Sequence, residues 1–390
     1  MTPRPARILP VIVLAQFAGT SLWFAVNAVL PDLQAAWALP PAALATVTSA
    51  VQLGFVAGTL AFALLMLADR FAPTRVFLAC SLLAALANAA IVLIDGSFAL
   101  LVALRFAVGF LLAGIYPVGM KIAASWYREG LGAALGWLIG ALVLGTALPH
   151  GLRALLAGGM AAGAVPPWQQ VALAVSALAA LGGLATFALV PGHPGPIGQR
   201  ITPRALAVIG TQPRLRASVF GYFGHMWELY SLYALVPAIV ATRFGGARVS
   251  GLAFCTIAAG AVGCIAGGLF ARRFGSARIA QWQLAASGAC CLLAPWALHA
   301  PAPLFVAWLL VWGATVAGDS PQFSALTAGN APAPVMGSVL TFSNCIGFAI
   351  SVVSIEVFVR AATHWPLEAV LPWLALGPAL GWVAMRPLLR

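Results

Sequence analysis

Charged side chains are almost absent from this chain, and they fall in the short breaks between about twelve apolar segments. Asp, Glu, Lys and Arg make up 7% of the 390 residues, 62% of the residues are hydrophobic, and the mean hydropathy is +1.00. A water-soluble core cannot bury that much apolar surface, so most of it must face lipid. The composition therefore predicts a polytopic membrane protein.

The apolar segments are long enough to cross a bilayer as helices, because about 20 residues span its hydrocarbon core. They lack the period-two alternation of roughly 10-residue barrel strands. We expect an all-α membrane protein with 12 transmembrane helices in two pseudo-symmetric six-helix bundles. The predicted spans are 8–30, 41–67, 74–94, 97–124, 131–151, 167–190, 218–240, 249–271, 277–298, 302–328, 335–360 and 368–386.

The basic residues predict the orientation of these spans. Most of the 20 Lys and Arg lie at one end of the predicted helices, and Arg153, Arg243, Arg248 and Arg360 lie at the other. Because cytoplasmic loops are enriched in basic residues, both termini are expected in the cytoplasm and the chain in the cell inner (plasma) membrane. The charges are spread thinly over several loops and form no patch with interleaved aromatics, so nucleic acid is not an expected partner.

The chain divides into two halves with a related sequence. A Pro-, Gly- and Arg-rich stretch at 191–217 predicts a cytoplasmic linker between an N-terminal bundle at 1–190 and a C-terminal bundle at 218–390. The loop DRFAPTR at 69–75 is echoed by RRFGSAR at 272–278, about 200 residues later. A duplicated six-helix unit explains both observations.

These loops make the chain resemble the Major Facilitator Superfamily of secondary transporters over its whole length. The family pattern GxxxDRxGRR is present in part, with Leu65 and Ala72 in place of two glycines. The resemblance implies that the matching charged residues act in conformational gating. These residues are Asp69, Arg70, Arg75, Arg273 and Arg278.

The predicted helix 218–240 carries the best candidates for proton coupling. Glu228 lies near the middle of this span, where a lone carboxylate would be protonated or paired. His225 precedes it by three residues, so we expect both side chains on one helix face, where they can share a proton. Asp319 lies two residues before Pro321, at a predicted helix break that typically lines a cavity. We expect these three residues to exchange the proton.

Arg105 lies inside the predicted helix 97–124, where an isolated guanidinium costs at least a few kcal/mol. It either supports the proton site and meets an anionic substrate, or hydrogen-bonds backbone and polar groups to brace neighbouring helices. In the family, helices 1, 2, 4, 5, 7, 8, 10 and 11 face a central cavity, and the polar residues of this chain lie on them. The expected substrate-binding residues are Arg105, Trp227, Tyr230, Asn344, Asn27 and Gln52.

Glycines recur every four residues in the predicted helix 131–151, at Gly132, Gly136 and Gly140. Small residues at this spacing allow two helices to approach closely, as a moving interface requires. We therefore expect this helix to pack tightly against a neighbour.

Together these features predict a proton-coupled secondary transporter, a symporter of a small polar or anionic organic solute that works by alternating access. The alternative is a divalent metal or organic cation transporter, with His225, Glu228 and Asp319 as the cation site. A membrane enzyme would need a nucleophile and base that the sequence does not offer, and a channel fits the two-fold repeat less well. We expect a monomer whose partners are substrate, protons and lipid, without a cofactor, a catalytic residue or a resident metal.

Overall fold

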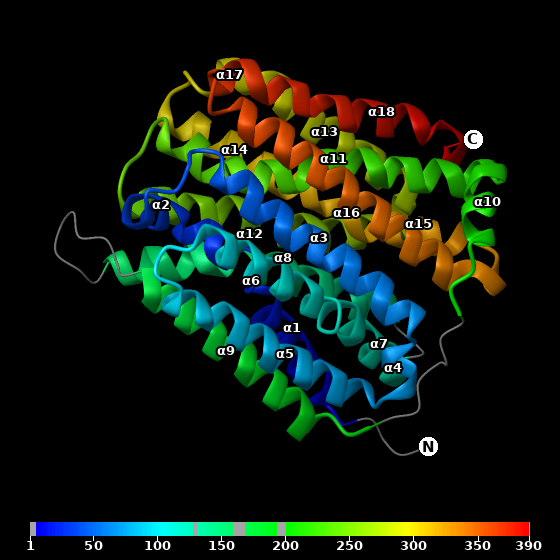
Figure 1. Ribbon diagram of the computed structural model, residues 1–390. Helices are drawn as coiled ribbons and strands as arrows, with labels where there is room; N and C mark the ends of the chain where they lie inside the picture. The colour runs from blue at the N-terminus through cyan, green and yellow to red at the C-terminus, as the bar shows by residue number, and fades with distance from the viewer. Residues whose placement is uncertain (1–4, 128–130, 159–167, 193–199, 390) are drawn as a thin grey trace.

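A computed structural model describes residues 5–127, 131–158, 168–192 and 200–389 as a set of long helices that run roughly along one direction (Figure 1). Ten of the described helical segments are long and apolar enough to cross a membrane. They include Ile8–Trp37, Phe98–Trp126 and Ala302–Asn330, each of which joins two helices. The prediction of an all-α membrane protein is confirmed.

The helices before the linker are α1 (Ile8–Thr20), α2 (Ala25–Trp37), α3 (Ala43–Leu64), α4 (Leu67–Arg70), α5 (Pro73–Ala89), α6 (Phe98–Leu112), α7 (Tyr116–Trp126), α8 (Leu131–Gly158) and α9 (Trp168–Leu189). Those that follow are α10 (Arg204–Thr211), α11 (Pro213–Ala241), α12 (Ala247–Phe274), α13 (Ser276–Ala297), α14 (Ala302–Gly318), α15 (Ser320–Asn330), α16 (Met336–Ala361), α17 (Leu367–Val370) and α18 (Leu376–Ala384). Two long helices, α11 and α13, lie outside the ten apolar spans. The predicted linker 191–217 contains α10, and α11 begins within it; its residues 193–199 lie outside the described ranges.

Three predicted spans are interrupted. The first breaks between Thr20 and Ala25, the fourth between Leu112 and Tyr116, and the tenth at Asp319. At the last of these, Pro321 has no N–H to donate to the carbonyl of Ala317, and the thiol of Cys264 on α12 donates to that oxygen at 3.3 Å. Of the three breaks, only this one was predicted from its proline, although Pro117 holds the same second position in α7.

The two halves repeat one close helix contact. A Cβ atom added at Gly109 of α6 would lie 2.0 Å from the carbonyl oxygen of Val51 on α3. In the second half, a Cβ atom added at Gly313 of α14 would lie 1.9 Å from the carbonyl oxygen of Thr256 on α12. Only glycine allows such an approach of two backbones. The same packing device in both halves supports the interpretation of a duplication.

The glycines that the sequence singled out in α8 do not serve this purpose. A Cβ atom at Gly136 or Gly140 would meet nothing within 4 Å, and the surroundings of Gly132 lie outside the described part. Farther along α8, Gly145 lies against Thr20 and the backbone of Phe17. The prediction of a tight α8 contact at Gly136 and Gly140 is wrong, because spacing alone does not show which face of a helix meets a neighbour.

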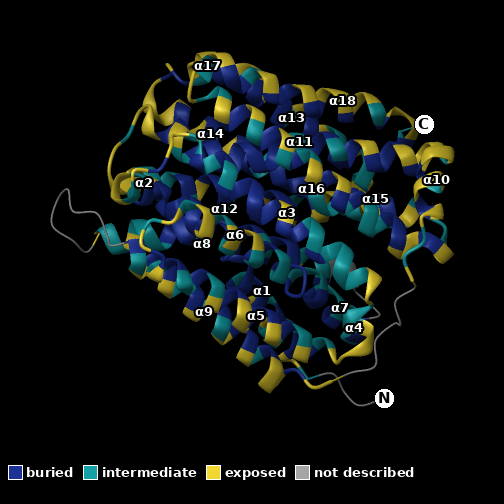
Figure 2. Ribbon diagram, viewed as in Figure 1, coloured by how far each residue is buried: buried dark blue, intermediate teal, exposed yellow. Residues whose placement is uncertain are grey.

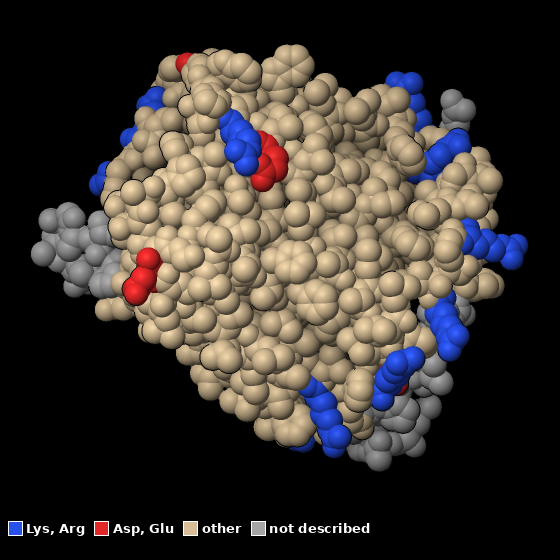
Figure 3. Space-filling view, in the orientation of Figure 1, with Lys and Arg blue, Asp and Glu red and all other residues tan. Residues whose placement is uncertain are grey.

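Helices from the two halves pack against each other through α8 with α12 and α3 with α16. Buried residues follow these central helices, and exposed apolar residues cover the outer helices such as α9 and α18 (Figure 2). Lys and Arg gather along the edge that carries α4 and α10, separated from the opposite edge by a broad uncharged band (Figure 3). We call these edges the α4/α10 end and the α2/α17 end.

Candidate functional site

A buried ion pair lies at the break between α14 and α15. His225 of α11 places Nδ1 2.7 Å from Oδ1 of Asp319, and both residues are at most 1% exposed. The contact is an ion pair when His225 carries a proton. Within the described residues, His225 Nε2 and Asp319 Oδ2 have no hydrogen-bond partner. The pair therefore keeps unused capacity for a proton or for another ligand group.

Glu228 lies nearby on α11 but has different partners. Its Oε1 accepts hydrogen bonds from Trp312 Nε1 of α14 at 2.5 Å and from Cys291 Sγ of α13 at 3.2 Å. Its Oε2 lies 2.9 Å from Ser287 Oγ of α13, which also lies 3.2 Å from the carbonyl oxygen of Leu284. A carboxylate accepts from Ser287, whereas a protonated Glu228 can donate to Ser287 while that hydroxyl donates to Leu284. The same contacts thus accommodate Glu228 with or without its proton.

The expectation that His225 and Glu228 share one proton on one helix face differs from the structure. His225 pairs with Asp319, and Glu228 is held by α13 and α14. The three-residue step leaves the two side chains at different angles around α11, and different neighbours meet each of them. The structure thus brings His225 and Asp319 together and sets Glu228 apart.

Arg105 braces the break in the first span. It is fully buried, and its Nη2 donates to the carbonyl oxygens of Leu22 at 3.0 Å and Trp23 at 2.5 Å. Its Nη1 lies 3.4 Å from Asn88 Oδ1 of α5. Residues between α1 and α2 have carbonyls without helical donors, and the planar guanidinium satisfies two of them at once. Of the two alternatives for Arg105, the bracing role is the one that these contacts support.

Replacing Arg105 by lysine should destabilise the protein by about 2–3 kcal/mol, because an ammonium keeps the charge but cannot reach both carbonyls and Asn88. The melting temperature of the purified protein measures this effect. It is determined from the loss of the monodisperse size-exclusion peak on heating. Arg248→Lys, at an exposed position, is the matched control. Equal melting temperatures for the two variants would contradict the bracing role.

Aromatic side chains from both halves meet at the centre of the molecule. Trp23 lies between α1 and α2 and stacks on Tyr230 of α11 and Phe348 of α16, with ring centroids 6.0 Å and 5.5 Å away. Phe55 of α3 is 4.5 Å from Phe348 and 4.8 Å from Trp23. We call Trp23, Phe55, Tyr230 and Phe348 the central aromatic cluster. The four rings pack on one another, and each side chain is at most 4% exposed.

Amide groups border this cluster. Gln52 Oε1 accepts a hydrogen bond from Trp23 Nε1 at 3.1 Å, and its Nε2 has no partner within the described residues. Asn27 Nδ2 donates to Thr48 Oγ1 at 2.8 Å, and its Oδ1 is likewise unpartnered there. Both residues are at most 4% exposed. Their free amide atoms are suited to bind a polar substrate or ordered water.

The remaining predicted substrate contacts are placed differently. Tyr230 belongs to the central aromatic cluster, whereas Trp227 packs on Phe358 and against Gly377 near α18. Asn344 is half-buried on α16, about one turn beyond Thr341. Trp227 therefore points away from the cluster. Sequence reasoning missed Trp23, Phe55 and Phe348, because neither period nor charge distinguishes a cluster aromatic from an ordinary apolar residue.

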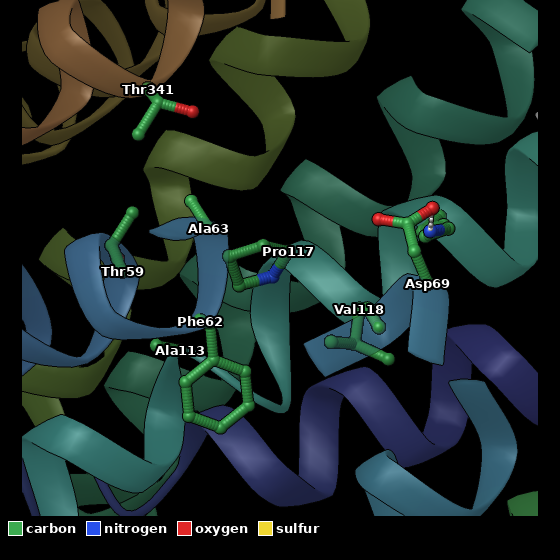
Figure 4. A pocket seen from close by; sticks show the side chains of 10 residues that line it. Thr59, Phe62, Ala63, Asp69, Ala113, Pro117, Val118 and Thr341 are labelled. Atoms are coloured by element: carbon green, nitrogen blue, oxygen red, sulfur yellow. Dashed lines mark hydrogen bonds and ion pairs between the residues drawn. The ribbon is translucent and has the colours of Figure 1, made fainter. Parts of the chain in front are cut away.

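A cavity of about 310 Å³ lies between the halves near the α4/α10 end (Figure 4). Thr59 and Ala63 of α3 face Thr341 of α16 across it, and Asp69 of α4 lies at its edge, paired with Lys121 of α7. The other predicted gating residues are exposed and form no ion pair within the described residues. They are Arg70, Arg75, Arg273 and Arg278.

The contacts of His225, Glu228 and Asp319 also bear on the cation alternative. Among the described residues, no group of three or more His, Cys, Asp or Glu side chains is arranged to hold a metal ion. Glu228 is turned toward Ser287 and Cys291, so it does not complete a ligand set with the His225–Asp319 pair.

Comparison with known sequences decides the family. The sequence model described as Major Facilitator Superfamily matches residues 12–355. The chain belongs to the Major Facilitator Superfamily. None of the curated proteins compared matches it.

Solved structures of superfamily transporters share the fold over nearly the whole chain. A bacterial homologue of the human lysosomal transporter Spinster, inward-facing and unoccupied, is 16% identical with a TM-score of 0.74 and covers 100% of this chain and 98% of its own. A mutant of the nucleoside transporter NupG is 12% identical with a TM-score of 0.76, covering 98% and 100%. The xylose transporter XylE from E. coli, partially occluded and inward open, is 11% identical with a TM-score of 0.78, covering 98% and 99%. At these identities the likeness shows the fold alone.

Proposed function

We propose that this superfamily member is a proton-coupled secondary transporter of a small polar organic solute, working by alternating access. The observation that carries the proposal is the His225–Asp319 pair, which is buried at a helix break inside the membrane-spanning region. Ionisable groups at such depth are costly, and in transporters they mark proton and ion pathways. A protein that needed the pair only for packing would be served as well by apolar side chains.

The pair and Glu228 supply the proposed coupling. Binding of a proton changes the charge of the His225–Asp319 pair, and thereby the attraction between α11 and the α14–α15 break. Glu228 keeps its three contacts in either protonation state, so it can store a proton without disturbing α13 and α14. We assign proton exchange to all three residues, with the His225–Asp319 pair as the group that changes helix packing.

The central aromatic cluster and its amides favour an uncharged polar solute over an organic anion. Arg105 is the buried arginine among the described residues, and its two Nη atoms contact Leu22, Trp23 and Asn88. A carboxylate that binds this guanidinium through two parallel hydrogen bonds would have to displace at least one of those contacts. Flat ring faces with nearby amides instead match a solute that combines a ring with hydroxyl or amide groups.

The contacts between α3 and α16 support a conformation that faces the cytoplasm. At the α2/α17 end, Arg360 of α16 donates to Thr46 Oγ1 of α3 at 3.4 Å. At the α4/α10 end, the cavity between Thr59 and Thr341 separates the same two helices. From its basic residues we assign the α4/α10 end to the cytoplasm, with the protein in the inner membrane and both termini in the cytoplasm. In this proposal twelve spans form two bundles, 1–190 and 218–390, which the linker 191–217 joins.

Cysteine labelling in membrane vesicles tests this orientation. With exposed Cys255 replaced by serine, a membrane-impermeant maleimide should modify Thr341→Cys in inverted vesicles and not in right-side-out vesicles. Thr363→Cys, in the exposed turn after α16 at the other end, is the matched control and should show the reverse pattern. Labelling of Thr341→Cys only from the outside would overturn the assignment.

Uptake into proteoliposomes with a pH-sensitive dye tests the function itself. The panel contains sugars, nucleosides, amino acids, organic acids and divalent metals, and wild type is compared with Glu228→Gln. Glutamine removes the titratable proton but can keep the three contacts, because its amide nitrogen can donate to Ser287 and its carbonyl oxygen can accept from Trp312 and Cys291. Solute-dependent proton movement in wild type that is lost in the variant supports the proposal. A response confined to metals would favour the cation transporter instead.

A further inference from the structure

A second cavity of about 360 Å³ lies at the α4/α10 end, apart from the central site. One wall is a single face of α11, where Pro213, Arg216, Ala217 and Phe220 follow one another at helical spacing. The other wall is the end of α18 and the turn after it. It consists of Val383, Ala384, Arg386 and Pro387. Two basic side chains and several apolar ones thus surround one hollow.

The cavity borders the lipid-facing surface of the protein. Phe220 and Val383 are each 49% exposed, although they lie on helices that belong to the membrane-spanning array. Exposed apolar side chains at this place contact acyl chains, whereas Arg216 and Arg386 lie closer to the ends of their elements, at the level of the lipid headgroups. The hollow therefore has an apolar side for lipid tails and a basic rim for a charged group.

Both arginines are held in place without being neutralised. Arg216 Nη1 donates to the carbonyl oxygen of Gly210 at 3.0 Å, and the guanidinium of Arg386 lies 5.6 Å from the ring centroid of Trp382. Neither forms an ion pair within the part of the chain that the structure describes. The sequence contains no Asp or Glu from residue 130 to 227 or from 369 to 390. The positive charge of the cavity is therefore left for an external anion.

We infer that this cavity binds the phosphate-bearing headgroup of an anionic phospholipid from the cytoplasmic leaflet. Guanidinium groups pair with phosphate oxygens through two parallel hydrogen bonds, and basic pockets between helices on the cytoplasmic side suit such headgroups. The apolar wall of Phe220 and Val383 distinguishes a lipid from a soluble phosphate, because only a lipid brings chains to cover it. The inference does not depend on which solute the protein transports.

Native mass spectrometry of the detergent-purified protein with added phosphatidylglycerol or phosphatidylcholine tests this site. Wild type should retain phosphatidylglycerol selectively, and the double variant Arg216→Gln/Arg386→Gln should bind it about thirtyfold more weakly. The matched control is Arg204→Gln/Arg214→Gln, which removes the same charge from exposed positions outside the cavity and should bind like wild type.

Three results would overturn the inference. Equal losses in both double variants would mean that general surface charge holds the lipid. Retention of phosphatidylcholine as strong as that of phosphatidylglycerol in wild type would remove the role of the anion. Displacement of the lipid by equimolar inorganic phosphate would show that the cavity takes a soluble anion. Unchanged phosphatidylcholine retention by Arg216→Gln/Arg386→Gln checks that this variant is folded.

Discussion

Asp319→Asn should abolish accumulation of solute driven by a proton gradient, while exchange of internal for external solute remains measurable. Asparagine has the shape of aspartate but cannot gain or lose a proton, and it cannot balance a positive charge on His225, whose Nδ1 lies 2.7 Å away. Leaving a charged His225 without its partner would cost about 3–5 kcal/mol, so the variant cannot form the charged pair. Uptake with and without an imposed gradient, beside solute counterflow, measures the two activities.

Glu356→Gln is the matched control for this result. Glu356 is also an acidic residue, but it pairs with Arg360 at the surface of the α2/α17 end and takes no part in the buried pair. This variant should accumulate solute like wild type. Gradient-driven accumulation by Asp319→Asn at the wild-type level would remove the His225–Asp319 pair from the coupling mechanism.

Gly313→Ala should prevent native packing of α12 against α14 and lower the stability by about 1–3 kcal/mol or more. The new Cβ atom would lie 1.9 Å from the carbonyl oxygen of Thr256, and neither backbone can move without shifting a whole helix. Gly109→Ala should have a similar effect in the first half, because its Cβ atom would lie 2.0 Å from the oxygen of Val51. The yield and melting temperature of the monodisperse protein measure both effects.

The control for these variants is Gly268→Ala on α12, where an added Cβ atom meets nothing within 4 Å. Since alanine favours a helix over glycine by about 0.5–1 kcal/mol, this variant should be as stable as wild type or slightly more stable. If Gly313→Ala melted at the same temperature as Gly268→Ala, the close approach of α12 and α14 would be refuted.

The positions of ten long apolar segments could be predicted from the sequence, because lipid imposes length and composition on every span. The predicted spans 97–124 and 302–328 correspond to the helical segments Phe98–Trp126 and Ala302–Asn330. The breaks inside them were harder to predict. Pro321 marks the break at Asp319, and Pro117 holds the same position in α7 after the break that follows Leu112, whereas no proline marks the break after Thr20.

The candidate site was predictable as a set of residue types but not as a geometry. A buried Glu, His and Asp stand out in an apolar chain, but the partners of each depend on which helices pack around α11. His225 and Glu228 are three residues apart on α11, but they contact different helices. Glu228 contacts Ser287 of α13, whereas His225 contacts Asp319 at the α14–α15 break. The same limitation applies to glycine: Gly136 and Gly313 look alike in the sequence, and only tertiary packing shows that Gly313 is indispensable.

The coupling of solute to protons is tested most directly by accumulation against a solute gradient. Proteoliposomes loaded with the identified solute at equal internal and external concentration receive an imposed inward proton gradient. With proton coupling, the internal concentration should rise above the external one, an uncoupler should abolish this rise, and Asp319→Asn should lack it. An internal concentration that stays at equilibrium with or without the gradient would contradict proton coupling and leave a uniporter or a carrier driven by another ion.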